Sequence, residues 1–162
     1  MPNWCNNKLR IEDCSPELAE YLKTEGLSFE KIKPTPPEMM NDEKGSWYGW
    51  RVNEWGTKWD IDEKEQREVA DMLLSESADF TAEFDTAWSP PLQAIAELSE
   101  QFPNDKFVLH YLELGCMFAG VAHITNGLTS DSDINQTSED IYRFAEEEFG
   151  LSYDELVDMD RA

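Results

Sequence analysis

The chain has 162 residues, of which 40% are hydrophobic and 12% aromatic, and its 35 acidic and 13 basic side chains give a formal net charge of -22. This length and composition predict one compact domain with a substantial core and argue against disorder. The excess of acids argues against binding to duplex DNA, which needs clustered Lys and Arg, and favours a positively charged partner.

Hydropathy and cysteine usage predict a cytoplasmic protein without a cofactor. No stretch approaches the roughly 20 apolar residues that span a bilayer, and the N-terminus lacks the apolar run of a signal peptide. Cys5, Cys14 and Cys116 form no CxxC pair and leave one thiol unpaired under any disulfide scheme, which fits a reducing compartment. We expect ordinary small residues, buried or half-buried, and no metal or cofactor.

The first part of the chain predicts a strand, a helix and a second, short strand. Apolar and polar residues alternate within residues 4–12, which is typical of a half-buried strand. Ser15 is a good N-cap because a proline follows it at the first helical position, and Gly26 ends the helix. Phe29 and Ile32 then indicate a short strand, which the following prolines terminate.

An irregular segment follows at residues 34–65. It holds four of the six tryptophans, between Trp47 and Trp59. A segment this long without secondary structure is unusual in a small domain and is often functional. Residues 66–75 are compatible with either a short helix or a strand.

The next segment predicts a strand and a helix. Apolar residues alternate with acids and threonines over residues 78–86, which indicates a strand with one apolar face. Ser89 is expected to cap a helix that begins at Pro90 and ends near Phe102.

Residues 106–127 predict a β-hairpin with a tight turn at 115–116. A two-residue turn would pair His110 with Val121 and bring His123 diagonally beside His110 on the same face of the sheet.

The C-terminal part predicts a linker and two helices. Residues 129–136 are polar and read as a linker. Thr137 or Ser138 starts an amphipathic helix, and Ser152 with Glu155 forms a capping box for a last short helix.

Two strand–helix–strand units in tandem specify an α+β fold, the ferredoxin-like sandwich, in which one antiparallel sheet carries both helices on a single face. We therefore expect a ferredoxin-like domain at residues 1–128, with a tryptophan-rich insertion at about 34–65, and an acidic helical extension at residues 129–162.

Several tryptophan-centred motifs also follow one another along the chain, namely MPNWCNNKLRI, FEKIKPTP, WGTKWD, FDTAWSPP and FAGV. Together they resemble the YubB-type ferredoxin-like family, small proteins of conjugative plasmids and phages, over about residues 1–126. The family pattern has Asn directly before WGTKW, whereas here Glu54 follows Asn53. The resemblance implies the fold and a mobile-element setting in a bacterial host, and it implies no catalytic activity. The residues that carry this structural signature are Trp4, Trp55, Gly56, Lys58, Trp59, Trp88, Ser89 and Pro90.

Three groups are candidate chemical sites, and each has a structural alternative that we favour. His110 and His123 could form an acid/base or metal pair, but Glu113 points away from His110, so we expect two core or sheet-surface residues without a carboxylate partner. The acidic run at 60–65 lacks the spacing of an EF-hand and reads as a solvated charge run. Ser89 has no GxSxG elbow and reads as a helix cap, not a nucleophile.

The aromatic residues of the insertion could form a stacking platform for single-stranded nucleic acid. Such platforms come with a basic groove, which this chain lacks, so we expect the indoles to pack onto the open face of the sheet. Trp55 and Trp59 would both be core anchors, and Lys58 would pair with Asp60 or a neighbouring acid. The aromatic set is Trp47, Tyr48, Trp50, Trp55 and Trp59.

The sequence thus favours a non-enzymatic phage or plasmid protein whose acidic surface engages a basic site on a host protein or nucleoprotein complex, for instance by imitating nucleic acid in a defence complex. A single-stranded nucleic-acid-binding module is the alternative, and a small hydrolase or metal enzyme is a second alternative for which no nucleophile, base and orienting group assemble. Neither duplex DNA nor a membrane is an expected partner. The acids expected to contact the partner are Asp131, Asp133, Glu139, Asp140, Glu146, Glu147, Glu148, Asp154, Glu155 and Asp158.

Overall fold

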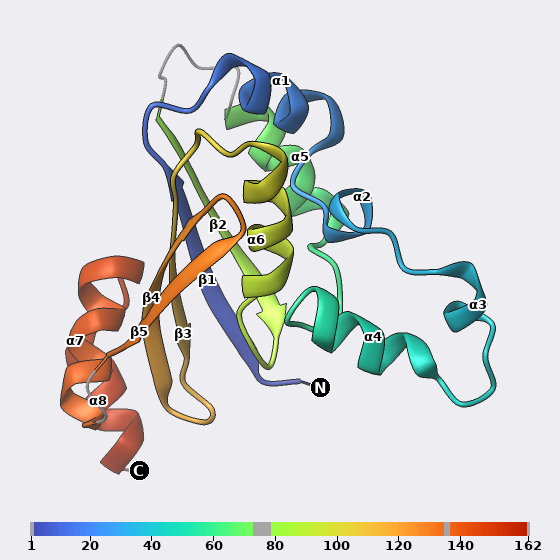
Figure 1. The fold of residues 1–162 in the computed structure, drawn as a ribbon. Helices are drawn as coiled ribbons and strands as arrows, with labels where there is room; N and C mark the ends of the chain where they lie inside the picture. The colour runs from blue at the N-terminus through green and yellow to red at the C-terminus, as the bar shows by residue number, and fades with distance from the viewer. Residues whose placement is uncertain (1, 73–78, 135–136, 162) are drawn as a thin grey trace.

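The computed structural model describes residues 2–72, 79–134 and 137–161 and contains one five-stranded sheet (Figure 1). The strand order is β2-β1-β3-β4-β5, and every neighbouring pair is antiparallel. The strands are β1 (Trp4–Ile11), β2 (Phe80–Ala87), β3 (Phe107–Glu113), β4 (Phe118–Thr125) and β5 (Leu128–Asp133).

Helices lie on both faces of this sheet. The first layer, which includes α1, α2 and α6, packs on the face that carries Leu9 and Leu109, and α7 packs on the opposite face against Leu112. The helices are α1 (Pro16–Glu25), α2 (Phe29–Ile32), α3 (Pro37–Met40), α4 (Ser46–Glu54), α5 (Glu63–Met72), α6 (Leu92–Gln101), α7 (Ser138–Phe149) and α8 (Tyr153–Arg161). No helix within the described residues is long and apolar enough to cross a membrane.

The second predicted strand–helix–strand unit is confirmed. β2 and β3 both run antiparallel to β1, which lies between them, so they are parallel to each other and α6 is their crossover. Phe80 and Phe84 of β2 are buried, as the alternation predicted, and they belong to the same core as Ile95 and Leu98 of α6. Residue 78, the expected start of this strand, lies outside the described residues.

The first predicted unit is wrong, because residues 29–32 form helix α2 and not a strand. Phe29 and Ile32 are both buried in the same core, and a spacing of three residues puts two side chains on one side of a helix but on opposite sides of a strand. The carboxylate of Asp60 accepts hydrogen bonds from the amides of Phe29 (2.7 Å) and Glu30 (3.2 Å). These bonds satisfy amides of the first turn that a four-residue helix cannot pair itself.

The fifth strand comes from the segment expected to be a linker. Asn126 and Gly127 form a two-residue turn between the paired residues Thr125 and Leu128, with φ of 48° and 77° respectively. Positive φ at both central positions is the geometry that Asn-Gly hairpins favour. All six residues of β5 are exposed, so the strand carries no apolar alternation that would mark it. The expected boundary at residue 128 thus falls at the start of a strand of the same sheet.

The β3–β4 hairpin has the predicted register. His110 lies opposite Val121, and His123 lies opposite Val108. The buried carboxylate of Glu113 holds the turn, since it accepts hydrogen bonds from the amides of Gly115 and Cys116.

The predicted irregular segment is partly helical, since it contains α3 and α4, and α5 shows that residues 66–72 are helical. Trp55, at the end of α4, is fully buried, and its ring centroid lies 5.8 Å from that of Phe29. Its indole Nε1 donates a hydrogen bond to the carbonyl of Lys33 (2.9 Å), and its carbonyl accepts one from the amide of Ala94 (3.1 Å). Trp55 therefore joins α2, α4 and α6.

Trp59 is not a core anchor, because 37% of its surface is exposed.

Ser89 is not the cap of α6, since the residue before α6 is Pro91 and the Ser89 hydroxyl donates a hydrogen bond to the carbonyl of Gly56. Gly56 has a φ of 90°, and an added Cβ would lie 2.8 Å from the carbonyl oxygen of Pro90. Glycine is needed there both for the backbone angle and for the close approach of the two chain segments.

The three cysteines are free, as expected, but Cys116 is exposed and not half-buried. Burial raises the pKa of the Cys5 thiol to about 12 and that of Cys14 to about 11. Both thiols are therefore protonated and unreactive at neutral pH.

Replacing Trp55 by Ala is expected to lower the free energy of unfolding by about 3–5 kcal/mol, because it leaves a large cavity in the core. Trp59→Ala is the matched control and should cost about 1 kcal/mol or less, since it removes a half-exposed ring. Urea unfolding followed by circular dichroism measures both. Equal losses in the two variants would contradict the difference in burial.

Candidate functional site

A cleft of about 550 Å³ lies between α5 and the ends of β1 and β2 that meet at Trp4 and Ala87. We call it the Trp4–Trp59 cleft. It is lined by the signature tryptophans Trp4 and Trp59 on one side and by carboxylates from β2 and α5 on the other. The lining residues are Trp4, Trp59, Asp60, Asp62, Lys64, Glu65, Glu68, Asp85, Thr86 and Ala87.

The two tryptophans are presented by different elements. The alternation of β1 places Trp4 on the face opposite to Cys5, away from α6, and 45% of its surface is exposed. Its ring centroid lies 6.2 Å from that of Trp59, with the planes inclined at 45°. The Nζ atom of Lys58 lies 4.7 Å from the centre of the Trp59 ring and 4.8 Å from that of Tyr48. Lys58 thus forms cation–π contacts where an ion pair with Asp60 was expected.

The acidic side of the cleft is built by a strand and a helix. Asp85 stands on the same face of the sheet as Trp4 and accepts a hydrogen bond from the Asn6 amide (2.8 Å). Asp62, Glu65 and Glu68 are spaced three residues apart at the start of α5, which puts them on one side of the helix. Burial raises the pKa of Glu65, and the neighbouring charges of Asp85 and Asp62 raise it further.

A second cleft of about 240 Å³ adjoins the first, because Glu65 and Asp85 line both. Phe149 and Leu151, at the end of α7 and just beyond it, line its far side, and Glu83 of β2 adds another carboxylate. The two clefts together run from the N-terminal end of β1 towards α7.

Several of the acids expected to contact a partner are engaged within the chain. Asp131 accepts a hydrogen bond from the Tyr111 hydroxyl (2.6 Å), and Asp133 lies farther from it (3.4 Å). Glu139 pairs with Arg143, Asp140 with Thr137, Glu146 with the amide of Tyr153, and Glu148 with Lys8 and His110. The exposed acids without such a role are Glu147, Asp154, Glu155 and Asp158.

The expectation that the histidines lack a carboxylate partner is wrong for His110. Nε2 of His110 lies 3.7 Å from the Glu148 carboxylate of α7, which also pairs with Lys8 (3.5 Å). Burial lowers the pKa of His110 more than Glu148 raises it, and its ring stacks on Phe144. His123 is exposed. These contacts attach α7 to the sheet.

The acidic run at 60–65 has two roles: Asp60 stabilises α2, and Asp62 and Glu65 line the cleft. Asp60 also accepts a hydrogen bond from the Ser28 hydroxyl (2.7 Å), so its main role is to cap α2. Within the described residues, no group of three or more His, Cys, Asp or Glu side chains could hold a metal ion.

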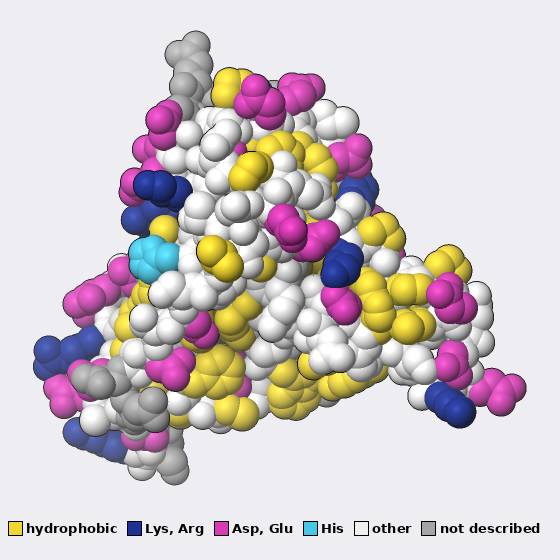
Figure 2. Space-filling model, in the orientation of Figure 1, with side chains coloured by type: hydrophobic (Ala, Val, Ile, Leu, Met, Phe, Trp, Pro, Cys, Tyr) yellow, Lys and Arg dark blue, Asp and Glu magenta, His cyan; other side chains and the backbone are white. Residues whose placement is uncertain are grey.

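The aromatic residues of α4 do not pack onto an open sheet face. Trp50 packs against the core beside Trp55, with ring centroids 6.1 Å apart, on the α6 side of the sheet. The guanidinium of Arg51 lies 5.0 Å from the centre of the Trp47 ring and 4.6 Å from that of Trp55. Tyr48 remains exposed. Figure 2 shows the hydrophobic side chains that gather over the arm formed by α3 and α4.

Residues 54–153 match the family model described as the ferredoxin-like domain in Api92-like protein. The chain belongs to this family. The matched range of the Api92-like domain begins next to Trp55 and continues through β5 and α7, so it includes part of the predicted extension. No curated protein and no solved structure matches the chain.

Sequence reasoning read Asp62 and Glu65 as part of a solvated charge run, did not single out Glu68 or Asp85, and did not predict that these carboxylates line one cleft. The signal that could have found them is the outward position of Asp85 in a strand with one apolar face and the three-residue spacing of Asp62, Glu65 and Glu68. These two patterns do not predict a common cleft, because neither of them indicates that α5 lies beside β2.

Glu65→Gln is expected to raise the melting temperature at neutral pH. The pKa of Glu65 is higher in the folded protein than in the unfolded chain. Ionisation of this carboxyl therefore destabilises the fold once the pH rises above the pKa that Glu65 has in the unfolded chain. The gain should disappear in acid, where Glu65 is protonated in both states. Thermal unfolding across this pH range measures it, and a gain that persists in acid would contradict the assignment.

Proposed function

We propose that this Api92-like domain is a non-enzymatic binding protein of a phage or plasmid that engages a basic surface of a host protein or nucleoprotein complex. Carboxylates fixed on a rigid fold can occupy sites built for phosphates, and their field speeds association in a salt-sensitive way. Complexes that handle nucleic acid, including defence complexes, have such basic sites.

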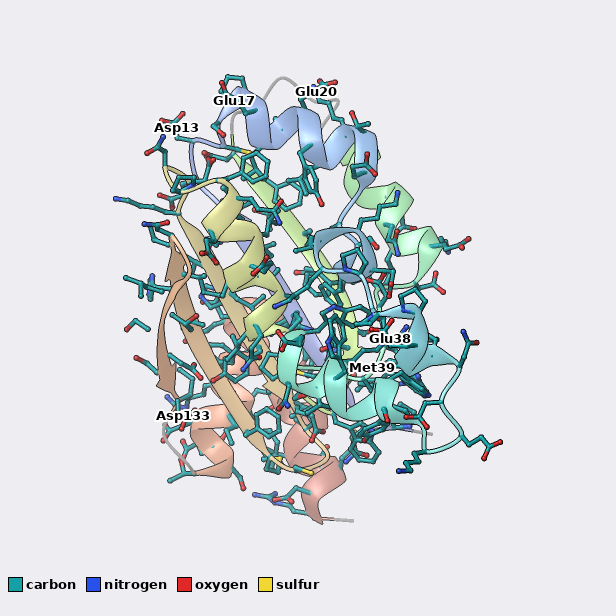
Figure 3. All side chains as sticks on the ribbon, turned by 45° about the vertical axis from the view of Figure 1, so that its right-hand side comes forward. Asp13, Glu17, Glu20, Glu38, Met39 and Asp133 are labelled. Atoms are coloured by element: carbon teal, nitrogen blue, oxygen red, sulfur yellow. The ribbon has the colours of Figure 1, made fainter. Side chains whose placement is uncertain are left out.

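The observation that carries the proposal is the net charge of -22 together with the placement of acids on elements other than the C-terminal helices. In Figure 3, Asp13, Glu17 and Glu20 lie around one end of the molecule, Glu38 on α3 and Asp133 at the end of β5. Acidic side chains also outnumber basic ones over the face shown in Figure 2. The field is therefore negative from many directions and is not confined to the C-terminal helices.

Many of the basic side chains are already engaged within the chain. They form ion pairs with neighbouring carboxylates or stack on aromatic rings, so they add little positive field at the surface. These residues are Lys8, Lys31, Lys33, Arg51, Lys58, Lys64 and Arg143.

The same contacts argue against a single-stranded nucleic-acid module. The exposed rings of Trp4 and Trp59 stand beside Asp85 and Glu65, which would repel the phosphates of any strand stacked on them. Known stacking platforms combine such rings with a positively charged groove.

The test is affinity capture from a bacterial lysate with the tagged chain, at low and then at high salt. We expect a nucleic-acid-handling protein to bind and its affinity, measured afterwards with the purified protein, to fall steeply as salt rises. Short single-stranded oligonucleotides should show no gel shift at low salt. Salt-independent binding of the captured protein, or a shift with the oligonucleotides, would overturn the proposal.

A further inference from the structure

The Trp4–Trp59 cleft has the composition of a site for an organic cation. The electron-rich faces of indole rings attract ammonium and guanidinium groups, and desolvation strengthens this attraction. Trp4 and Trp59 keep 45% and 37% of their surfaces exposed, although large aromatic side chains are usually buried. The exposed rings border a cleft of about 550 Å³, which is large enough for a long side chain.

The charges around the cleft do not balance. Five carboxylates line it, and one of them, Asp60, is engaged at the start of α2. The other four are Asp62, Glu65, Glu68 and Asp85, and among the described lining residues the one basic side chain is Lys64. Lys64 lies 4.0 Å from Glu68, so at most one of the four carboxylates is compensated by it. Burial raises the pKa of Glu65, and the nearby charges of Asp85 and Asp62 raise it further.

Lys58, which precedes Trp59 in the sequence, does not enter the cleft. Lys58 stands over the rings of Trp59 and Tyr48 and is absent from the lining residues. It holds the Trp59 ring in place. Among the side chains that the structure describes, no lysine or arginine forms an ion pair with Glu65 or Asp85, so both carboxylates are open to a cation from another molecule.

We propose that the Trp4–Trp59 cleft takes a lysine or arginine side chain from a basic peptide segment of the partner protein, with its charged group between the tryptophan rings and the carboxylates of Glu65 and Asp85. This assignment rests on the proposed function and names its central contact. The adjoining cleft, with Glu83, Phe149 and Leu151, lets the segment continue along the sheet towards α7.

The experiment titrates the full chain with a short peptide in which arginine alternates with glycine, and with its lysine counterpart. The six tryptophans give six indole N–H resonances, which single Trp→Phe variants assign. We expect the resonances of Trp4 and Trp59 to shift, and that of the buried Trp55 to stay in place.

Calorimetric titration of variants then shows which residues contribute to the affinity for the peptide. Trp59→Ala and the double variant E65Q/D85N should each weaken peptide binding by about tenfold. The double variant E20Q/E38Q removes the same charge from α1 and α3, which do not line the cleft, and should weaken peptide binding by less than about twofold, because exposed charges outside the site are screened. Trp88→Gly removes an equally exposed indole outside the cleft, at a position whose φ of 71° suits glycine, and should bind as the wild type does.

Several outcomes overturn the inference, and they are distinguishable from failure of the proposed function. If E20Q/E38Q weakens binding as much as E65Q/D85N, or if the indole resonances of Trp4 and Trp59 do not move, the cleft is not the site, although a salt-sensitive acidic binder remains. If spermidine binds as tightly as the peptides, the cleft is a small-cation site and not a peptide site. If neither the peptides nor any basic host protein bind, both proposals fail.

Discussion

Burial of the Trp55 indole fixes the arrangement on which the cleft depends. The ring lies in the core beside Phe29, and hydrogen bonds from its ring and to its carbonyl connect α4 to the neighbouring segments. The residues that follow are tied to the end of β2, because the Thr57 hydroxyl donates to the carbonyl of Ala87 (2.8 Å) and the Ser89 hydroxyl to that of Gly56. Trp59 comes directly after these anchors and is therefore held beside Trp4.

The WGTKWD motif thus has an inner and an outer side. Trp55, Thr57 and Asp60 make the contacts that stabilise α2, α4 and the end of β2. Trp59 is partly exposed and lines the cleft, and Lys58 stands over its ring. Because both sides belong to six consecutive residues, a structural requirement and the proposed binding surface coincide in one motif. Rigid support of this kind lowers the entropy cost of binding, since the exposed ring is already ordered.

The sequence predicted elements whose signals are local and missed what depends on distant contacts. Alternation identified β2, and the two-residue turn rule gave the register of β3 and β4. Phe29 and Ile32 were assigned to a strand although Ser28, the N-cap of α2, is a local helix signal. The further hydrogen bonds that hold the first turn of α2 come from Asp60, about 30 residues away, and could not be expected from the local sequence. The burial of Trp55 and the exposure of Trp59 could not be separated from sequence, because both are tryptophans of one motif and their surroundings are assembled by tertiary packing. The cleft carboxylates were missed for the same reason.

The fifth strand has a consequence for association between copies of the chain. β5 is an edge strand, and an exposed edge offers its backbone N–H and C=O groups to any other strand that approaches. Its outer positions are exposed and carry Asp131 and Asp133, with Tyr111 holding the first of them through its hydroxyl. A second β5 laid alongside would bring carboxylates against carboxylates in a largely acidic surface. The strand that completes the sheet therefore also ends it, because its carboxylates disfavour edge-to-edge pairing of identical molecules.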